Sequence, residues 1–140
     1  MKPQARRKAR SLALQAIYQW QLVADDVVNI KMQFVDKINS KKVDAEYFND
    51  LLDGVIKNVG AIDEVITPLL DRKITDLDAV ELAVLRLATY ELMLRLDVPY
   101  KVVINEALEL TKNFGSIEGY KYINGVLDKV ARQLRTDKKS

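Results

Sequence analysis

Apolar residues recur at intervals of three and four along most of the chain, which is the spacing of amphipathic helices. Pro3 suits the first turn of the first such segment, because its missing N–H would be unpaired there anyway. No segment alternates apolar and polar residues as a half-buried strand does. The pattern predicts an all-α protein whose first helix covers residues 3–24 through the stripe Ala9, Leu12, Ala13, Ala16, Ile17, Trp20 and Val23.

Capping and breaking residues mark the next three helices. Asp26, with Asp25 before it, can cap a second helix, and Asp44 can cap a third. Gly60 interrupts the third stripe, so a short fourth helix is expected beyond it. Pro68 is expected to kink that fourth helix or to make it restart.

The second half of the chain predicts three longer helices. The fifth begins after Asp76 or Asp78 and is apolar nearly all round, which is typical of the most buried helix of a bundle. Pro99 falls in the first turn of the sixth, which is expected to end at Gly115 in the left-handed conformation that glycine favours. A last helix is expected over residues 116–134. About seven helices with short connections predict one compact domain of antiparallel neighbours.

Composition excludes most familiar enzyme classes. The chain has 140 residues, of which 49% are hydrophobic, and it contains no cysteine and no histidine. It therefore lacks disulfides, thiolate or imidazole metal ligands and the usual general base at neutral pH. The sequence predicts a protein that is not an enzyme, with no metal and no cofactor. Without a secretory signal or an apolar stretch of about 20 residues, a cytoplasmic protein with no membrane contact is expected.

Charge is distributed unevenly, with basic ends on an acidic body. Residues 1–24 carry five cations and no acid. Arg6, Arg7, Arg10 and Tyr18 fall on the polar side of the first predicted helix, where cations and an aromatic ring can meet phosphates and bases. Phe114 stands at a helix end, where its ring either projects toward a ligand or joins the core.

Some charged residues are expected to serve the fold or to lie outside it. Arg86 lies in the apolar fifth helix and needs a partner if it is buried, for which Glu91 and Glu106 are candidates. The charged residues 136–140 are expected to form a disordered tail after a domain over residues 1–135.

Three segments carry a resemblance to a known family. They read ELAVLRLATYEL at 81–92, DVPYKVVINEALELTKNFG at 97–115 and YINGVLDKVA at 122–131. With ARRKAR and QAIYQWQ near the start, the whole chain resembles the NusB family of bacterial transcription antitermination factors. The resemblance implies two packed three-helix bundles. It also implies a heterodimer with the ribosomal protein NusE that binds boxA RNA, notably in ribosomal RNA operons, beside other Nus factors and RNA polymerase. Some members self-associate.

The resemblance also implies site residues. Glu81 is the expected contact to the protein partner. The expected RNA surface consists of Lys2, Arg6, Arg7, Arg10, Gln15, Tyr18, Arg72, Phe114 and Glu118.

Two other functions remain open at this point. One is a protein-interaction scaffold whose basic helix binds acidic protein. The other is an RNA-binding accessory domain related to the ribosomal RNA cytosine methyltransferases, which share this motif. Binding of a boxA-like RNA in the presence of the partner distinguishes the first of these from an antitermination factor.

Overall fold

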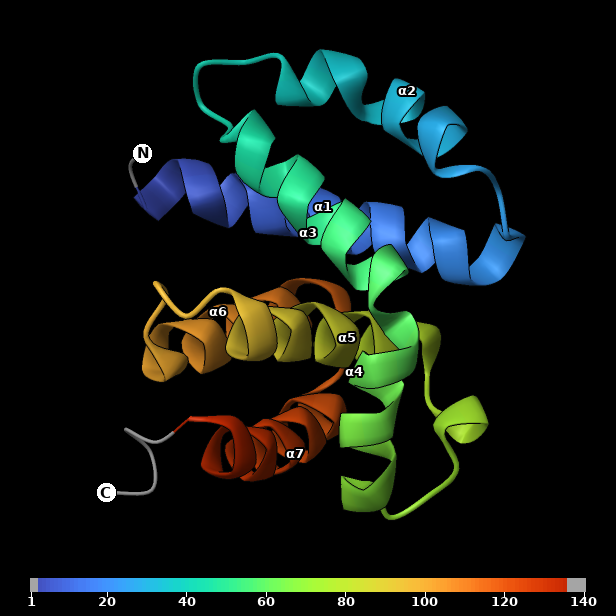
Figure 1. Ribbon diagram of the computed structural model, residues 1–140, viewed down its shortest axis with the longest axis vertical. Coiled ribbons are helices and arrows are strands. Elements are labelled where there is room, and N and C mark those ends of the chain that lie inside the picture. Colours follow the sequence, from blue (N-terminus) through green and yellow to red (C-terminus); the bar gives the residue numbers. More distant parts are fainter. Residues whose placement is uncertain (1–2, 136–140) are drawn as a thin grey trace. The chain divides into compact units, whose positions relative to one another are not determined.

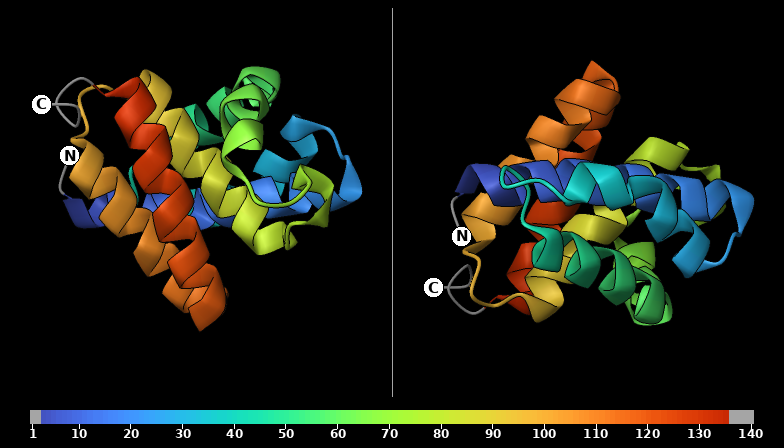
Figure 2. Two further views of the ribbon diagram at one scale, coloured as in Figure 1. Left: turned by 90° about the horizontal axis from the view of Figure 1, so that it is seen from below. Right: turned by 90° about the horizontal axis from the view of Figure 1, so that it is seen from above.

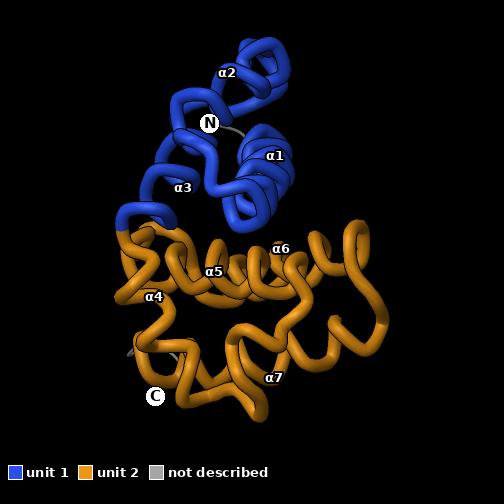
Figure 3. Tube along the Cα trace, turned by 90° about the vertical axis from the view of Figure 1, so that its right-hand side faces the viewer, with its two compact units in different colours: residues 1–57 blue, residues 58–140 orange. Residues whose placement is uncertain are grey.

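Within residues 3–135, which the computed structural model describes, the chain forms seven α-helices and two short 3-10 turns (Figure 1). The all-α prediction is confirmed. The helices fall into two compact units, residues 1–57 (unit 1) and residues 58–140 (unit 2), coloured separately in Figure 3. Lys2 and the expected tail at 136–140 lie outside the described residues.

Unit 1 contains α1 (Pro3–Val23), α2 (Val27–Ile38) and α3 (Ala45–Lys57). Asp26 caps α2 by accepting a hydrogen bond from the Val28 amide at 3.1 Å, as the sequence predicts. Asp44 likewise accepts from the Tyr47 amide at 3.0 Å and begins α3. α3 crosses α1 in Figure 1 and packs against it.

The core of unit 1 combines small residues on α1 with large ones on the other two helices. Ala9, Ala13 and Ala16 are fully buried, so a neighbouring backbone can approach α1 closely. α2 contributes Ile30 and Phe34, and the Phe34 ring lies 5.8 Å from that of Phe48 on α3.

Unit 2 contains α4 (Val59–Ile66), α5 (Ala79–Leu94), α6 (Tyr100–Phe114) and α7 (Ile117–Leu134). The 3-10 turns Thr67–Leu69 and Ile74–Asp76 connect α4 to α5. α5, α6 and α7 pack pairwise, α4 covers α5 and α7, and Figure 2 shows α7 running beside α5. Unit 2 therefore has one short helix more than the three-helix bundle that the resemblance implies.

The central position of α5 is confirmed. Nine of its residues between Ala83 and Leu92 are buried, on all sides of the helix. Its one strong cation, Arg86, forms a two-pronged ion pair with Asp63 of α4, with N···O distances of 3.0 and 2.9 Å. Asp63 was not among the expected partners, which were Glu91 and Glu106. The fold, and not the sequence spacing, brings Asp63 to α5.

Several helix ends differ from the expectation. α3 stops at Lys57 and α4 begins after Asn58, so Gly60 is inside α4 and is not the break. Pro68 falls in the 3-10 turn that follows α4, as expected of a residue without an N–H. Asp78, and not Asp76, caps α5. Pro99 is the N-cap of α6 and precedes its first turn.

Gly115 does not adopt the left-handed conformation. Its φ is −120° and its ψ is −157°, which is extended backbone. A Cβ there would lie 3.0 Å from the Thr111 carbonyl oxygen, so crowding at the end of α6 explains the glycine. Among residues 3–135, Ala24 adopts the left-handed conformation, with φ of 50°, directly after α1.

No helix among residues 3–135 combines the length and apolar character needed to cross a bilayer.

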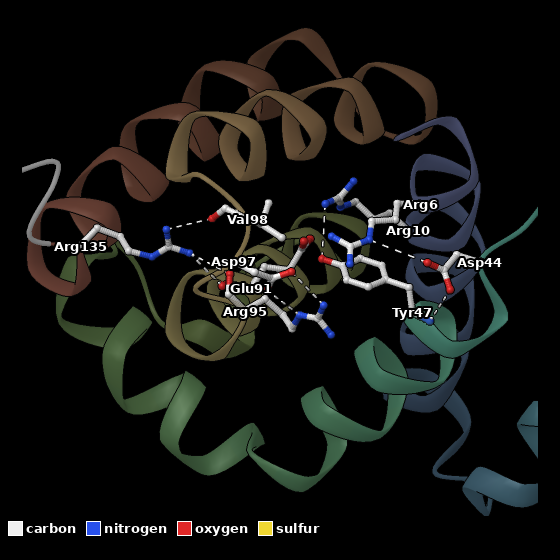
Figure 4. A network of polar contacts seen from close by, with 9 residues as sticks. All are labelled: Arg6, Arg10, Asp44, Tyr47, Glu91, Arg95, Asp97, Val98 and Arg135. Carbon is white, nitrogen blue, oxygen red and sulfur yellow. Dashed lines mark hydrogen bonds and ion pairs between the residues drawn. The ribbon is translucent and has the colours of Figure 1, made fainter. Parts of the chain in front are cut away.

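Arg135, directly after α7, links the end of α5 to the connection that leads to α6. The Arg135 guanidinium is buried and donates to four backbone carbonyls, those of Glu91, Leu92, Arg95 and Val98, over 2.9–3.2 Å. Figure 4 shows this side chain reaching Val98. The Leu92 carbonyl lies in the last turn of α5, where carbonyls lack partners within the helix. The Glu91 and Arg95 carbonyls also accept from backbone amides, so Arg135 adds a charged donor to each of them.

Replacing Arg135 by methionine is therefore expected to lower the free energy of unfolding by about 2–4 kcal/mol, since buried carbonyls lose charged donors. Amide hydrogen exchange should accelerate at residues 92–98. Arg132→Met is the matched control, because Arg132 is exposed and pairs with Asp128 of its own helix, at 3.3 Å. It should cost no more than about 0.5 kcal/mol. Equal losses in urea denaturation would contradict a clamping role for Arg135.

Candidate nucleic-acid interface

The polar side of α1 separates into an exposed face and a packed face. Arg7 and Tyr18 are exposed, and their spacing of eleven residues places them on one side of the helix. Gln15 is half-buried, and its Nε2 donates to the Ser11 carbonyl at 3.1 Å. Lys8 is also exposed and was absent from the predicted set, although its charge alone could have suggested it.

Arg10 belongs to the packed face. The expectation that it lies on the exposed side of the helix is wrong, since only 4% of the residue is accessible. Its Nη2 donates to the Tyr47 hydroxyl at 3.4 Å, and its guanidinium lies 5.2 Å from the centre of that ring. The helical spacing of cations could not reveal this, because Tyr47 comes from another helix.

Arg6 also lies against Tyr47. Its guanidinium carbon is 4.3 Å from the ring centre, and its Nε is 3.8 Å from the Asp44 carboxylate (Figure 4). Part of the Arg6 side chain, 29%, remains accessible. Tyr47 and Asp44 therefore contact the Arg6 guanidinium, while part of its side chain stays accessible to solvent.

In unit 2, Phe114 lies at the end of α6 and is 43% exposed. Of the two interpretations that the sequence left open, the projecting ring agrees with this exposure. A hollow of about 260 Å³ lies beside it, lined by Lys112, Gly115, Ser116, Ile117 and Tyr120. Glu118 is exposed in the first turn of α7, which Ser116 caps by accepting from the Gly119 amide at 3.0 Å.

Arg72 and Tyr122 form a second cationic and aromatic site in unit 2. The exposed Arg72 guanidinium lies 4.3 Å from the Tyr122 ring centre and 2.7 Å from the Asp71 carboxylate. Its hydrogen bond lowers the pKa of Asp71, and burial raises the pKa of the Tyr122 hydroxyl. Sequence reasoning missed Tyr122, although it follows Glu118 by one helical turn on α7.

Glu81 lies in the same part of unit 2. Burial, and then the negative charge of Asp78, raise the pKa of the Glu81 carboxyl, while Arg72 acts in the opposite direction. A Cβ on Gly119 would lie 2.6 Å from Glu81 Oε2, so this carboxyl sits directly on the backbone of α7. The structure thus brings Arg72, the first turn of α7 and the expected partner contact Glu81 together.

The predicted site residues therefore form two groups within the described part of the chain. Unit 1 holds five of them on α1, which are Arg6, Arg7, Arg10, Gln15 and Tyr18. Unit 2 holds Arg72, Glu81, Phe114 and Glu118. Both groups combine cations with an exposed aromatic ring, which is the combination that single-stranded nucleic acids require.

Comparison with known proteins identifies the chain's relatives. The model of the NusB family matches residues 7–132. The chain belongs to the NusB family. It is 56% identical to a transcription antitermination protein NusB of Alcanivorax borkumensis over 133 residues, covering 95% of this chain and 89% of the relative. It is 51% identical to that of Serratia proteamaculans over 138 residues, covering 99% of this chain and all of the relative.

Solved structures of NusB proteins have the same fold. T. maritima NusB matches with a TM-score of 0.81 at 31% identity, covering 96% of each chain. A NusB protein in a complex of the antitermination factors NusB and NusE with double-stranded RNA matches with a TM-score of 0.84. It is 28% identical and covers 94% of this chain and 99% of its own. The relatives are thus bacterial transcription factors, in agreement with the expectation of a protein that is not an enzyme.

Because α1 has an exposed face and a packed face, replacing a cation on each face is expected to change the free energy of unfolding by different amounts. Arg10→Gln should lower the free energy of unfolding by about 2–3 kcal/mol, because it removes buried charged hydrogen bonds. Lys8→Gln, at an exposed position of the same helix, should change it by no more than about 0.5 kcal/mol. Urea denaturation of both variants measures the difference. Equal urea denaturation midpoints of the two variants would contradict the burial of Arg10.

Proposed function

We propose that the chain is a transcription antitermination factor that binds single-stranded boxA RNA together with the ribosomal protein NusE. The observation that carries the proposal is the exposure of Tyr18 and Phe114, each in a unit that also presents accessible cations. Accessible aromatic rings offer stacking platforms to unpaired bases.

The chemistry of the two groups fits RNA of this kind. Arg7, Lys8 and the accessible part of Arg6 can neutralise phosphates, which supplies affinity without sequence preference. Base stacking on Tyr18 and Phe114 requires bases that are not already stacked in a duplex, which favours a single strand. We propose that Arg10 supports this surface from below and does not contact RNA itself, because it is buried against Tyr47.

A solved relative supports the pairing with NusE. It is a NusB protein in a complex with NusE and double-stranded RNA. We extend the pairing with NusE to the present chain. We also propose that the chain acts in the cytoplasm, together with RNA polymerase and the other Nus factors, on ribosomal RNA operons. NusE would add a second RNA-contacting surface and so raise the effective concentration of RNA at the first.

RNA binding can be tested by fluorescence anisotropy with a labelled boxA single strand, the same sequence as a duplex, and a range of salt concentrations. With three to five phosphates neutralised, the slope of log affinity against log salt should be roughly −2 to −3.5. The single strand should bind more tightly than the duplex, and NusE should tighten binding further. No binding to the single strand, with or without NusE, would refute the proposal.

Phe114→Ala should weaken single-strand binding by about 1–3 kcal/mol with little change in the salt slope, because stacking displaces no counterions. Leu94→Ala is the matched control, since Leu94 is an exposed apolar residue at the end of α5, with 52% accessible. It should leave RNA affinity unchanged. Equal affinities of the parent and the Phe114→Ala protein would exclude stacking on this ring.

Glu81→Lys should weaken the complex with NusE at least about tenfold at low salt, because a cation replaces an acid opposite a basic partner. Titration calorimetry measures the effect. Glu64→Lys, the same charge reversal at an exposed position of α4, is the control and should change NusE affinity little. RNA binding by the isolated chain should be nearly the same for both variants. Unaltered NusE affinity of Glu81→Lys would place the partner interface elsewhere.

A further inference from the structure

We infer that Tyr47 of α3 is a positioning residue for RNA binding, which holds the Arg6 guanidinium in the orientation used to contact a phosphate. Tyr47 is only 2% exposed and lies on a helix that contributes none of the expected RNA contacts. Its effect on RNA would therefore act through Arg6. This inference rests on the proposed RNA-binding function and adds to it a residue of α3.

The geometry places Arg6 over the face of the Tyr47 ring. At 4.3 Å from the guanidinium carbon to the ring centre, the cation lies on the negative face of the aromatic system. Asp44 approaches the Nε side at 3.8 Å. The ring and the carboxylate together restrict a long side chain, of which 29% is still accessible.

Tyr47 is itself held in place by the elements around it. Arg10 donates to its hydroxyl at 3.4 Å, and its backbone amide donates to the Asp44 side chain at 3.0 Å. The Asp44 amide in turn donates to the Ala5 carbonyl at 3.1 Å, which joins the start of α3 to the first turns of α1. The ring is thus fixed relative to the same part of α1 that carries Arg6.

This restraint matters because arginine loses considerable side-chain freedom when it is immobilised on a ligand. A guanidinium that is already stacked has lost much of that freedom in the free protein. Stacking occupies only the face of the guanidinium, and 29% of the Arg6 side chain is accessible, so this accessible part can still meet a phosphate. The prediction is that removing the ring weakens RNA binding although no charge is lost.

Tyr47→Leu tests this, because leucine keeps a buried apolar side chain but offers no aromatic face. RNA affinity should fall about fivefold, the size expected of one cation–aromatic contact. Tyr47→Phe, which keeps the ring, should recover most of the loss. Phe48→Leu is the matched control, since Phe48 is the adjacent fully buried aromatic of α3 and is not placed over either arginine. It should lower the melting temperature without changing RNA affinity.

A double-mutant cycle with Arg6→Gln separates positioning from general support of the fold. If Tyr47 acts through Arg6, then Tyr47→Leu should cause no further loss in the Arg6→Gln protein. Additive losses, or equal loss in Phe48→Leu, would overturn the inference while leaving the RNA-binding proposal intact. A parent chain that binds no single-stranded RNA would overturn both.

A measurement on the unmodified protein covers the case in which Tyr47→Leu does not fold. Nitrogen relaxation of the arginine Nε groups should show Arg6 nearly as rigid as the helix backbone in the free chain, with Arg132, whose side chain is 67% accessible, more mobile. Equal mobility of Arg6 and Arg132 would mean that Tyr47 does not restrain Arg6, and the inference would be wrong.

Discussion

A helix that is apolar on every side has to be covered on every side, and α5 is such a helix. Its buried residues from Ala83 to Leu92 leave no face for solvent. Within unit 2, α4, α6 and α7 pack against it. Two of its polar groups have partners from outside the helix, Asp63 for the Arg86 side chain and Arg135 for the Leu92 carbonyl.

The same arrangement produces the exposed ring at the end of α6. α6 ends where the Thr111 carbonyl leaves no room for a Cβ at Gly115, and Ser116 starts α7 at once. With only two residues between the helices, Phe114 falls at the tip of the corner, where 43% of it stays accessible. The short connection between α6 and α7 thus leaves the Phe114 ring exposed at the end of α6.

Many features set by short stretches of sequence could be predicted, although the interpretation of Gly60 and Gly115 was wrong, and features set by distant contacts could not. Helical stripes and the caps at Asp26 and Asp44 are local, and the structure has them. The exposure of Tyr18 followed from its place on a polar face, whereas the sequence left the exposure of Phe114 open. The partner of Arg86 and the burial of Arg10 depend on residues 23 and 37 positions away, which periodicity does not identify.

For arginine, the local sequence pattern and the contacts with distant residues lead to different conclusions. A basic helix suggests a set of phosphate contacts, yet a guanidinium can also be buried wherever rings and oxygen atoms surround it, as at Arg10 and Arg135. Counting the cations of α1 therefore overstates the charge that it offers to RNA. Fewer phosphate contacts mean weaker binding by the chain alone and a greater dependence on stacking and on a partner surface. If Arg10 fixes Tyr47, it still contributes to RNA binding from its buried position. An Arg6 side chain that is already ordered loses less freedom on binding a phosphate, so the same charge gives a stronger contact.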